Sequence, residues 1–153
     1  MYLVDTNIHA AYLLQNYEND DVTRQYLHFY ETVSLVDRAI PDFILGEFET
    51  FMMQVVPSRY NLQIEDKRKI QQLTTEYMQN LTTDCTLIVP DTETFQYAKD
   101  IYFEYLNSHY ISFVDALVLA TADRNSYPIL TKDERMKLLA KRMNISFFQP
   151  DII

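Results

Sequence analysis

Short apolar runs alternate along the chain with longer segments in which apolar residues recur every three or four positions. Runs of the first kind are typical of buried strands, and the spacing of the second kind is that of a helix with one apolar face. The alternation predicts an α/β fold in which parallel strands form a sheet covered by helices on both faces. Strands are expected at residues 2–5, 33–40, 85–90 and 128–131, with a last one near 147, and helices at 7–15, 20–31, 41–56, 62–82, 92–106, 112–124 and 133–143.

Two of these helical segments have patterns that place them in the interior. In residues 41–56, PDFILGEFETFMMQVV, apolar residues form a stripe that faces the core, and the helix is expected to end before Pro57. Residues 112–124 are apolar nearly all round, which indicates a helix buried on most sides. The stripe of the first segment consists of Ile44, Phe48, Phe51, Met52 and Val55.

Length and composition favour one compact domain. The chain has 153 residues, of which 48% are hydrophobic, and it contains no repeats, low-complexity tracts or glycine- and serine-rich linkers. A single domain over residues 1–153 is therefore expected. No run of 18 apolar residues is present, and Asp5 follows the first apolar run too closely for a secretory segment, so we expect a cytoplasmic protein without membrane contact.

Two scarce residue types exclude several common kinds of site. Gly46 is the only glycine, whereas phosphate-binding loops, dinucleotide-binding turns and the nucleophile elbow of serine hydrolases all require glycines. Cys85 is the only cysteine, and the three histidines lie far apart in the sequence, so neither disulfides nor a cysteine and histidine zinc site is supported. Any metal site in this chain would consist of oxygen ligands.

Four acidic residues border apolar segments, namely Asp5, Glu47, Asp115 and Asp133. A carboxylate set against apolar residues has to be protonated, hydrogen-bonded or bound to a cation, and several together form a site for Mg²⁺ or Mn²⁺. Asp5 ends the first predicted strand and Asp133 follows the fourth by two residues, so both point to the edge where parallel sheets bind ligands. The pattern predicts a metal-assisted phosphodiester hydrolase.

The local sequence leaves a simpler interpretation open for some of these acids. Asp5 and Asp133 each precede a predicted helix, where an aspartate commonly caps the first turn. Glu47 and Glu49 border the same apolar stripe, and periodicity does not choose between them. Asp115 is harder to explain as a surface residue, because its helix has few positions that face solvent and an unpaired charge is costly to bury.

The segments VDTN, FILGEF, SFVDALVLATA and ILTKD, in this order and at these separations, resemble the PIN domain, and most closely the VapC-type toxins. Those toxins are small single-domain ribonucleases of toxin–antitoxin pairs. The resemblance runs from the first residue to the NISFFQPD tail. It implies a three-layer α/β/α sandwich around a central parallel sheet, an Mg²⁺- or Mn²⁺-dependent endoribonuclease activity on RNA, and a small antitoxin protein as partner.

By the same matching, the four acids of the family correspond to Asp5, Glu47, Asp115 and Asp133, and the resemblance thus selects Glu47 within the apolar stripe. We assign Asp5 and Asp115 as direct or water-mediated ligands of the cation, with the other two acids completing the set and orienting the attacking water. Two departures concern the rim of the pocket, where NSYP replaces a glycine-containing stretch and Met136 replaces a frequent aromatic residue. Four polar residues are expected to fix the carboxylates by hydrogen bonds: Thr6, Asn7, Ser112 and Thr131.

Charge qualifies this expectation. The net charge of −9 and the pI of about 4.7 oppose tight binding of a polyanion, although bound divalent ions reverse the local potential around carboxylates. Lys132 and Arg135 lie beside the fourth acid and are expected to bind substrate phosphates, with an exposed helix face as the alternative. The acidic balance also suits a basic protein partner, and the aromatic content of 14% fits core packing or a homodimer interface.

Two other classes of function remain compatible with the sequence. A phosphatase of the haloacid dehalogenase type also opens with a strand followed by an aspartate and uses Mg²⁺, but it needs a second aspartate two residues later, where this chain has Asn7. A non-catalytic module could instead use an acidic groove to bind a basic peptide. Trapping a phosphoaspartate at Asp5 would support the first alternative, and heat of metal binding that Asp115→Asn abolishes would exclude the second.

Overall fold

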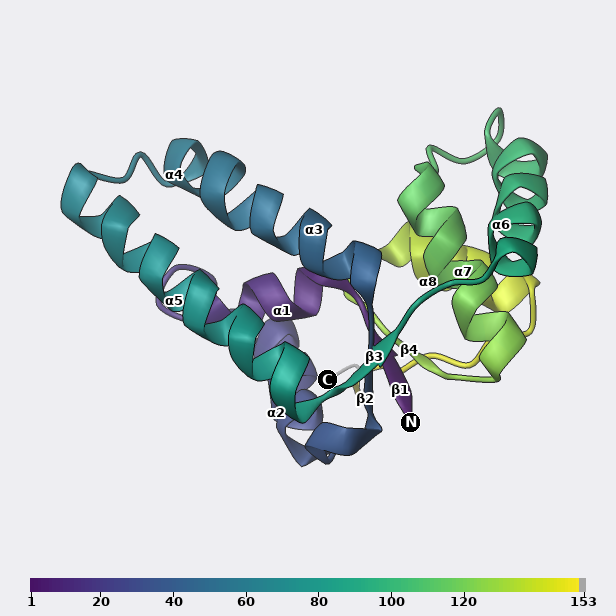
Figure 1. The fold of residues 1–153 in the computed structure, drawn as a ribbon, viewed down its shortest axis with the longest axis horizontal. Coiled ribbons are helices and arrows are strands. Elements are labelled where there is room, and N and C mark those ends of the chain that lie inside the picture. Colours follow the sequence, from purple (N-terminus) through teal and green to yellow (C-terminus); the bar gives the residue numbers. More distant parts are fainter. Residues whose placement is uncertain (152–153) are drawn as a thin grey trace.

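The computed structural model describes residues 1–151, and a four-stranded sheet forms its centre (Figure 1). The strands are β1 (Tyr2–Val4), β2 (Arg38–Pro41), β3 (Thr86–Ile88) and β4 (Ile129–Leu130). Their order across the sheet is β3-β2-β1-β4, and every pair is parallel. The register aligns Leu3 with Ala39 on one side and with Ile129 on the other. The predicted parallel sheet is therefore confirmed.

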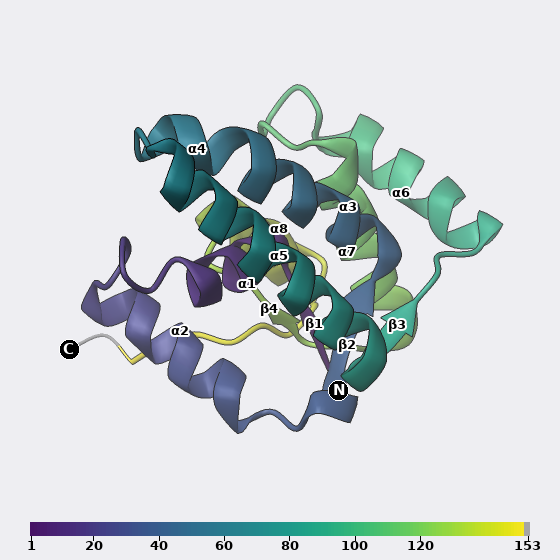
Figure 2. The same cartoon turned by 60° about the vertical axis from the view of Figure 1, so that its left-hand side comes forward.

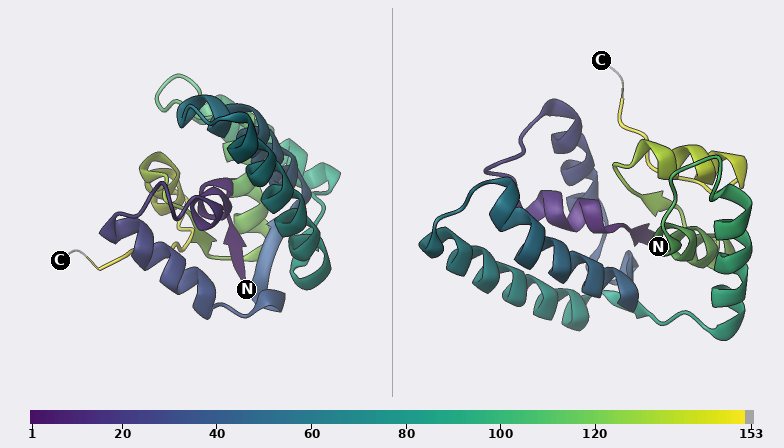
Figure 3. Two further views of the ribbon diagram at one scale, coloured as in Figure 1. Left: turned by 90° about the vertical axis from the view of Figure 1, so that its left-hand side faces the viewer. Right: turned by 90° about the horizontal axis from the view of Figure 1, so that it is seen from above.

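Helices cover both faces of this sheet. Figures 1 and 3 show α1 to α5 on one side and α6 to α8 on the other, which confirms the predicted three-layer α/β/α sandwich. Within residues 1–151, no helix is both long enough and apolar enough to span a membrane. The helices are α1 (Thr6–Leu13), α2 (Asp21–Thr32), α3 (Asp42–Thr50), α4 (Val56–Arg59), α5 (Ile64–Asp84), α6 (Thr92–Tyr105), α7 (Phe113–Asn125) and α8 (Glu134–Arg142).

The main core surrounds the sheet and includes the buried helix α7. Leu3, Ile40 and Leu130 are 0% exposed, and they come from three neighbouring strands. Every residue from 116 to 122 in α7 is buried, as the apolar pattern of this segment predicts. A strand that is covered on both faces and a helix that is covered on most sides leave few places for a charge. The acidic residues that flank these elements are consequently confined to the edge of the sheet.

All the predicted strands are shorter than expected, and the second and the last differ most. Residues 33–37 do not join β2, because Leu35–Asp37 form a 3₁₀ turn in which Val36 is 65% exposed. Pro41, which was expected to begin the following helix, is instead the last residue of β2 and pairs with Ile88. The run near residue 147 contributes only a single parallel bridge between Ile129 and Phe147. Both segments are apolar, but tertiary packing provides neither with a long neighbouring strand.

The helix predicted at residues 41–56 is also different, since it does not end before Pro57. Residues Phe51–Val55 form a π-helical segment that joins α3 to α4, and Pro57 lies in the first turn of α4, where its missing N–H is tolerated. Val55 is 39% exposed whereas Val56 is fully buried, so the buried stripe has a regular spacing of four residues. That stripe consists of Ile44, Phe48, Met52 and Val56.

The helices α3 and α4 run outward from the sheet as one rod, and α5 returns alongside them (Figures 1 and 2). A second apolar cluster fills the space between this pair and α1, and it includes Ala10, Phe48 and Ile70. One side of α1 is thereby fixed to the rod. The N-terminus of α1 follows β1 directly, so the rod and the carboxyl edge of the sheet meet near Asp5.

Candidate active site

A cavity of about 310 Å³ opens at the carboxyl edge of the sheet, and all four acids singled out in the sequence line it. Asp5 follows β1, Glu47 lies on α3, Asp115 is in the first turn of α7, and Asp133 immediately precedes α8. Residues that are more than one hundred positions apart in the sequence therefore face one space. The remaining lining residues are Thr6, Asn7, Ala10, Ala11, Leu14, Glu18, Phe51, Arg59 and Lys132.

Asp5 is the most enclosed of the four acids, with only 7% of its surface exposed. It caps α1, and its Oδ1 atom accepts a hydrogen bond of 2.8 Å from the Thr6 N–H. Its Oδ2 atom accepts bonds from Asn7 Nδ2 at 2.8 Å and from Thr131 Oγ1 at 2.7 Å. Three donors thus fix the carboxylate in one orientation at the end of the central strand.

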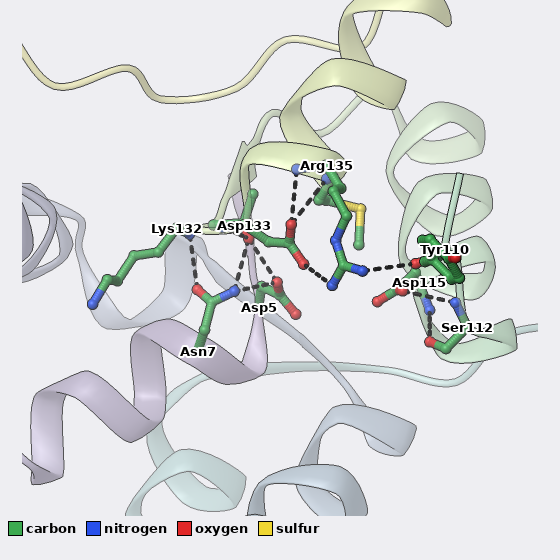
Figure 4. A network of polar contacts seen from close by, with 10 residues as sticks. Asp5, Asn7, Tyr110, Ser112, Asp115, Lys132, Asp133 and Arg135 are labelled. Atoms are coloured by element: carbon green, nitrogen blue, oxygen red, sulfur yellow. Dashed lines mark hydrogen bonds and ion pairs between the residues drawn. The ribbon is translucent and has the colours of Figure 1, made fainter. Parts of the chain in front are cut away.

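Asn7 and Thr131 join β1 to β4 behind this carboxylate (Figure 4). The Asn7 amide donates to Thr131 Oγ1 at 2.9 Å, and its oxygen accepts the Lys132 N–H at 2.9 Å. The Thr131 hydroxyl also accepts the Asp133 N–H at 3.1 Å. This network couples the first and fourth acids, because it ties the chain after β1 to the chain after β4.

The surroundings raise the pKa of Asp5 from 3.8 to about 7. The largest cause is burial, which penalises the charged carboxylate, and the negative charges of Glu47 and Asp115 act in the same direction. The hydrogen bonds from Thr131 and Thr6 oppose this rise by stabilising the charged form. A carboxylate whose ionised form is destabilised in this way tends to bind either a proton or a cation.

Glu47 faces the cavity, whereas Glu49 on the same helix is exposed to solvent. The Thr6 hydroxyl donates a hydrogen bond to Glu47 Oε2, which joins the start of α1 to α3. Of the two glutamates between which periodicity did not choose, Glu47 is thus the one that lines the cavity. Thr6 has two roles, because its N–H orients Asp5 and its hydroxyl orients Glu47.

Asp115 and Asp133 both lie at helix N-termini. Asp115 forms a capping box with Ser112, in which its Oδ2 accepts the Ser112 N–H at 2.9 Å and its own N–H donates to Ser112 Oγ at 3.0 Å. Asp133 caps α8, and its Oδ1 accepts the Arg135 N–H at 2.8 Å. Capping and exposure to the cavity therefore coexist in these two residues.

The two cations predicted to bind substrate have partners within the chain. The Arg135 guanidinium lies 3.6 Å from Asp133 Oδ2 and donates to the Tyr110 carbonyl oxygen at 3.1 Å, so it stands between Asp133 and Asp115 (Figure 4). Lys132 Nζ donates to Thr23 Oγ1 at 2.7 Å and lies 3.9 Å from Glu18 Oε2. Lys132 lines the cavity, whereas Arg135 borders it from the side of α8.

The donors in this cavity fit Mg²⁺ or Mn²⁺ in kind, because they are carboxylate oxygens and include one buried acid whose charge is opposed. Within residues 1–151, however, no three acidic, histidine or cysteine side chains are grouped closely enough to hold one ion. Asp115 and Asp133 are held by their caps, and Arg135 stands between them. Rotation of these side chains toward Asp5 would be needed to complete a set of ligands.

Sequence reasoning missed two residues at the outer end of the cavity, Glu18 and Arg59. Neither borders an apolar segment in the way that the four acids do. A signal for Arg59 was nevertheless present, because Glu47, Phe51 and Arg59 are separated by multiples of four residues. Only the continuation of the helix through Pro57 makes that spacing meaningful.

Comparisons with known proteins identify the fold. A PIN domain family model matches residues 2–142, and no curated protein matches the chain. The structure resembles VapC20 of Mycobacterium tuberculosis, described as a sarcin-ricin loop cleaving toxin, with a TM-score of 0.64, 14% identity and coverage of 91% of this chain and 95% of VapC20. At such identity the likeness shows the fold alone.

Two further solved structures are similar. FitAcB from Neisseria gonorrhoeae has a TM-score of 0.70 and 16% identity, and the match covers 98% of each chain. A toxin–antitoxin complex from Klebsiella pneumoniae has a TM-score of 0.58 and 18% identity, and the match covers 100% of each chain. The similarity extends over the whole architecture that surrounds the cavity.

The raised pKa of Asp5 predicts a pH-dependent stability in protein freed of metal by a chelator. The unfolded chain loses the Asp5 proton near pH 3.8 and the folded chain only near 7, so ionisation of this group costs folding free energy as the pH rises between these values. Asp5→Asn removes this cost. The free energy of unfolding of the variant, minus that of the wild type, should increase by roughly 1.4 kcal/mol for each pH unit between 5 and 7 and level off above.

Urea unfolding in EDTA at several pH values measures this difference directly. A difference that stays constant from pH 5 to pH 8 would show that the Asp5 carboxyl ionises as freely in the folded protein as in the unfolded chain.

Proposed function

This chain belongs to the PIN domain family, and on that premise we propose that it is a divalent-metal-dependent endoribonuclease, the toxin of a toxin–antitoxin pair. The resemblance inferred from the four motifs is confirmed by the family match over residues 2–142. One of the similar structures, VapC20, is described as a toxin that cleaves the sarcin-ricin loop, and another is a toxin–antitoxin complex. These descriptions support the proposal for a chain that shares their architecture.

A single observation carries the proposal, namely the convergence of four acids from separate segments on one cavity. Asp5 is held there almost out of solvent by three hydrogen bonds, with two other acids raising its pKa. Placing like charges together is unfavourable in a protein that only has to be stable. The arrangement becomes favourable when a divalent cation compensates the charges.

A bound Mg²⁺ or Mn²⁺ would supply a more acidic attacking water and stabilise charge on the phosphoryl oxygens and the leaving group. Asp5 and Asp115 would hold the ion, with Asp5 fixed by Asn7 and Thr131 and Asp115 fixed by Ser112. Glu47, oriented by the Thr6 hydroxyl, would accept a hydrogen bond from the attacking water at its carboxylate. Asp133 would complete the acidic wall opposite Glu47 once Arg135 turns toward the substrate phosphates.

The same proposal implies a protein partner, a location in the cell and an oligomeric state. The acidic cavity in a chain of net charge −9 would attract a basic side chain of a small antitoxin by charge complementarity. We place the whole of residues 1–153 in one nuclease domain that acts on RNA in the cytoplasm and associates as a homodimer. The phosphatase alternative gains no support, because Asn7 donates its amide to Asp5 and offers no carboxyl group at the position where that chemistry needs one.

Loss of a candidate ligand should remove cleavage. Asp5→Asn and Asp115→Asn should each lower kcat by more than the roughly 10- to 100-fold that loss of a residue supporting a metal ligand costs. The measurement is cleavage of a panel of transfer, ribosomal and messenger RNA fragments with and without Mn²⁺. Circular dichroism should show that both variants remain folded. Equal cleavage by the wild type and Asp5→Asn would show that the cleavage does not depend on Asp5 and comes from a contaminating nuclease. That result would refute the proposal.

The pair Glu47 and Glu49 offers a test in which two variants lose the same charge from the same helix. Glu47→Gln should reduce RNA cleavage by at least about tenfold, because an oriented carboxylate at the cavity is lost. Glu49→Gln makes the same chemical change on the exposed face and should cleave like the wild type. Similar losses in both variants would mean that the general acidity of α3 matters rather than the position of Glu47.

Metal binding separates the nuclease from a groove that only binds protein. Titration calorimetry with Mn²⁺ should give a saturable heat for the wild type that Asp115→Asn abolishes, because this carboxylate faces the cavity. Asp123→Asn is the matched control, since Asp123 is exposed on the same helix and lies outside the cavity. A wild type without any heat of metal binding would favour the non-catalytic module.

A further inference from the structure

One face of the rod formed by α3, the π-helical segment and α4 lies along the cavity. Glu47, Phe51 and Arg59 project from this face, and all three line the same space of about 310 Å³. They are separated by four and eight residues. The row therefore leads from one of the four acids to the outer end of the cavity.

An unbroken α-helix would not keep these residues in line. At about 100° per residue, positions 51 and 59 would differ by roughly 80° around the helix axis. The π-helical segment at Phe51–Val55 bonds each residue to the fifth one along, so each residue turns less and the difference is removed. The outcome is visible in the structure, where the Arg59 guanidinium lies over the Phe51 ring at 5.2 Å from its centroid.

The charge of Arg59 is available to a ligand. Among residues 1–151, no carboxylate lies within ion-pair distance of Arg59, whereas Lys132 in the same cavity is 3.9 Å from Glu18 and bonds Thr23. The contact with Phe51 is a cation–π contact, with the guanidinium carbon over the ring, and it needs no carboxylate partner. A guanidinium group without an ion-pair partner is well suited to the oxygens of a phosphate.

The floor between the acids and Arg59 is small and apolar. It consists of Ala10 and Ala11 of α1 and of Leu14, which follows the end of this helix, and all three are at most 6% exposed. Glu18 is the carboxylate at the outer end, where it accepts a hydrogen bond from the Tyr60 hydroxyl and lies 3.9 Å from Lys132 Nζ. A strand of nucleic acid could follow this floor with its phosphates facing the rod.

We propose that Arg59, held over Phe51, is the binding site for the phosphate next to the one that is cut. This inference rests on the proposed ribonuclease function and deepens it. One helical turn of about 5.4 Å separates Phe51 from Glu47, and the Arg59 side chain reaches back to the level of Phe51. We take these two spacings, one helical turn and the contact over Phe51, to put the guanidinium on the order of one nucleotide step from Glu47. Phe51 acts as a positioning residue, because it orients Arg59 without contacting the phosphate.

The first test measures RNA binding and turnover in Arg59→Gln. Fluorescence anisotropy with single-stranded RNA in EDTA should show about fivefold weaker binding at 0.1 M salt, with a salt slope about 0.7 units shallower, as expected for one lost phosphate contact. In Mn²⁺, KM should rise by a similar factor while kcat changes little. Arg68→Gln removes the same charge from the exposed face of α5 and should bind and cleave like the wild type.

If the role of Arg59 were only structural, different results would be expected. Arg59 is the last residue of α4, where its positive charge also stabilises the carboxyl end of the helix dipole. Arg59→Gln would lose this stabilisation as well. Arg59→Lys keeps the charge but not the flat guanidinium edge, so it should retain the salt slope and recover part of the affinity. Thermal unfolding of the three variants shows whether any loss of binding comes from loss of folding instead.

The second test identifies the phosphate. In a series of RNA oligonucleotides, each phosphate in turn is replaced by a neutral methylphosphonate, and each oligonucleotide is bound to the wild type and to Arg59→Gln. The loss of affinity caused by Arg59→Gln should vanish for one oligonucleotide only, the one whose neutral methylphosphonate lies immediately beside the cleavage position. An effect that persists for every oligonucleotide would overturn the proposed contact.

The outcomes separate the two proposals. A wild type that neither binds nor cleaves RNA would end the proposed function and this inference together. A wild type that cleaves RNA in an Asp5-dependent way, with Arg59→Gln behaving like Arg68→Gln in affinity, salt slope and KM, would overturn only the phosphate site at Arg59.

Discussion

The structure around the cavity depends on one buried carboxylate at the end of the central strand. Asp5 sits where β1 gives way to α1, and the donors that fix it come from its own helix and from the segment after β4. Its neighbours Asn7 and Thr131 in turn hold the backbone that leads to Asp133. Burial and neighbouring negative charge make this arrangement costly for the ionised group, and the cation proposed for this site would offset that cost.

Capping and chemistry are not rival explanations for the acids in this fold. Asp5, Asp115 and Asp133 each accept a backbone N–H at the start of a helix, and each also lines the cavity. The two properties share a cause. Asp5 and Asp133 cap α1 and α8, which directly follow β1 and β4 and so begin at the carboxyl edge, where such sheets bind ligands, whereas Asp115 reaches the cavity because α7 begins there after α6. The caps also hold the carboxylates in fixed rotamers before any ligand arrives.

The proposed action on RNA requires an acidic protein to place its few cations well. The chain carries 13 basic residues against 22 acidic ones, and most cations near the cavity are already paired. Arg135 stands between two of the acids, where it offsets their repulsion in the absence of another cation. Arg59 differs in that an aromatic ring rather than a carboxylate holds it. The π-helical segment that creates this contact lies in the rod and leaves the sheet unaffected.

The sequence by itself determined the class of the fold and offered Asp5, Asp115 and Asp133 as candidate acids, whereas only the family resemblance selected Glu47 over Glu49. Strand and helix periodicities, helix caps and the apolar run of α7 are local properties, and they fixed most elements to within a few residues. Tertiary structure decided what local pattern could not. It shortened the second strand by exposing Val36, carried a helix through Pro57, and turned Glu47 rather than Glu49 toward the cavity. It also created the site itself, because carboxylates at positions 5, 47, 115 and 133 meet only when parallel strands align their ends, and that alignment is set by packing between distant segments.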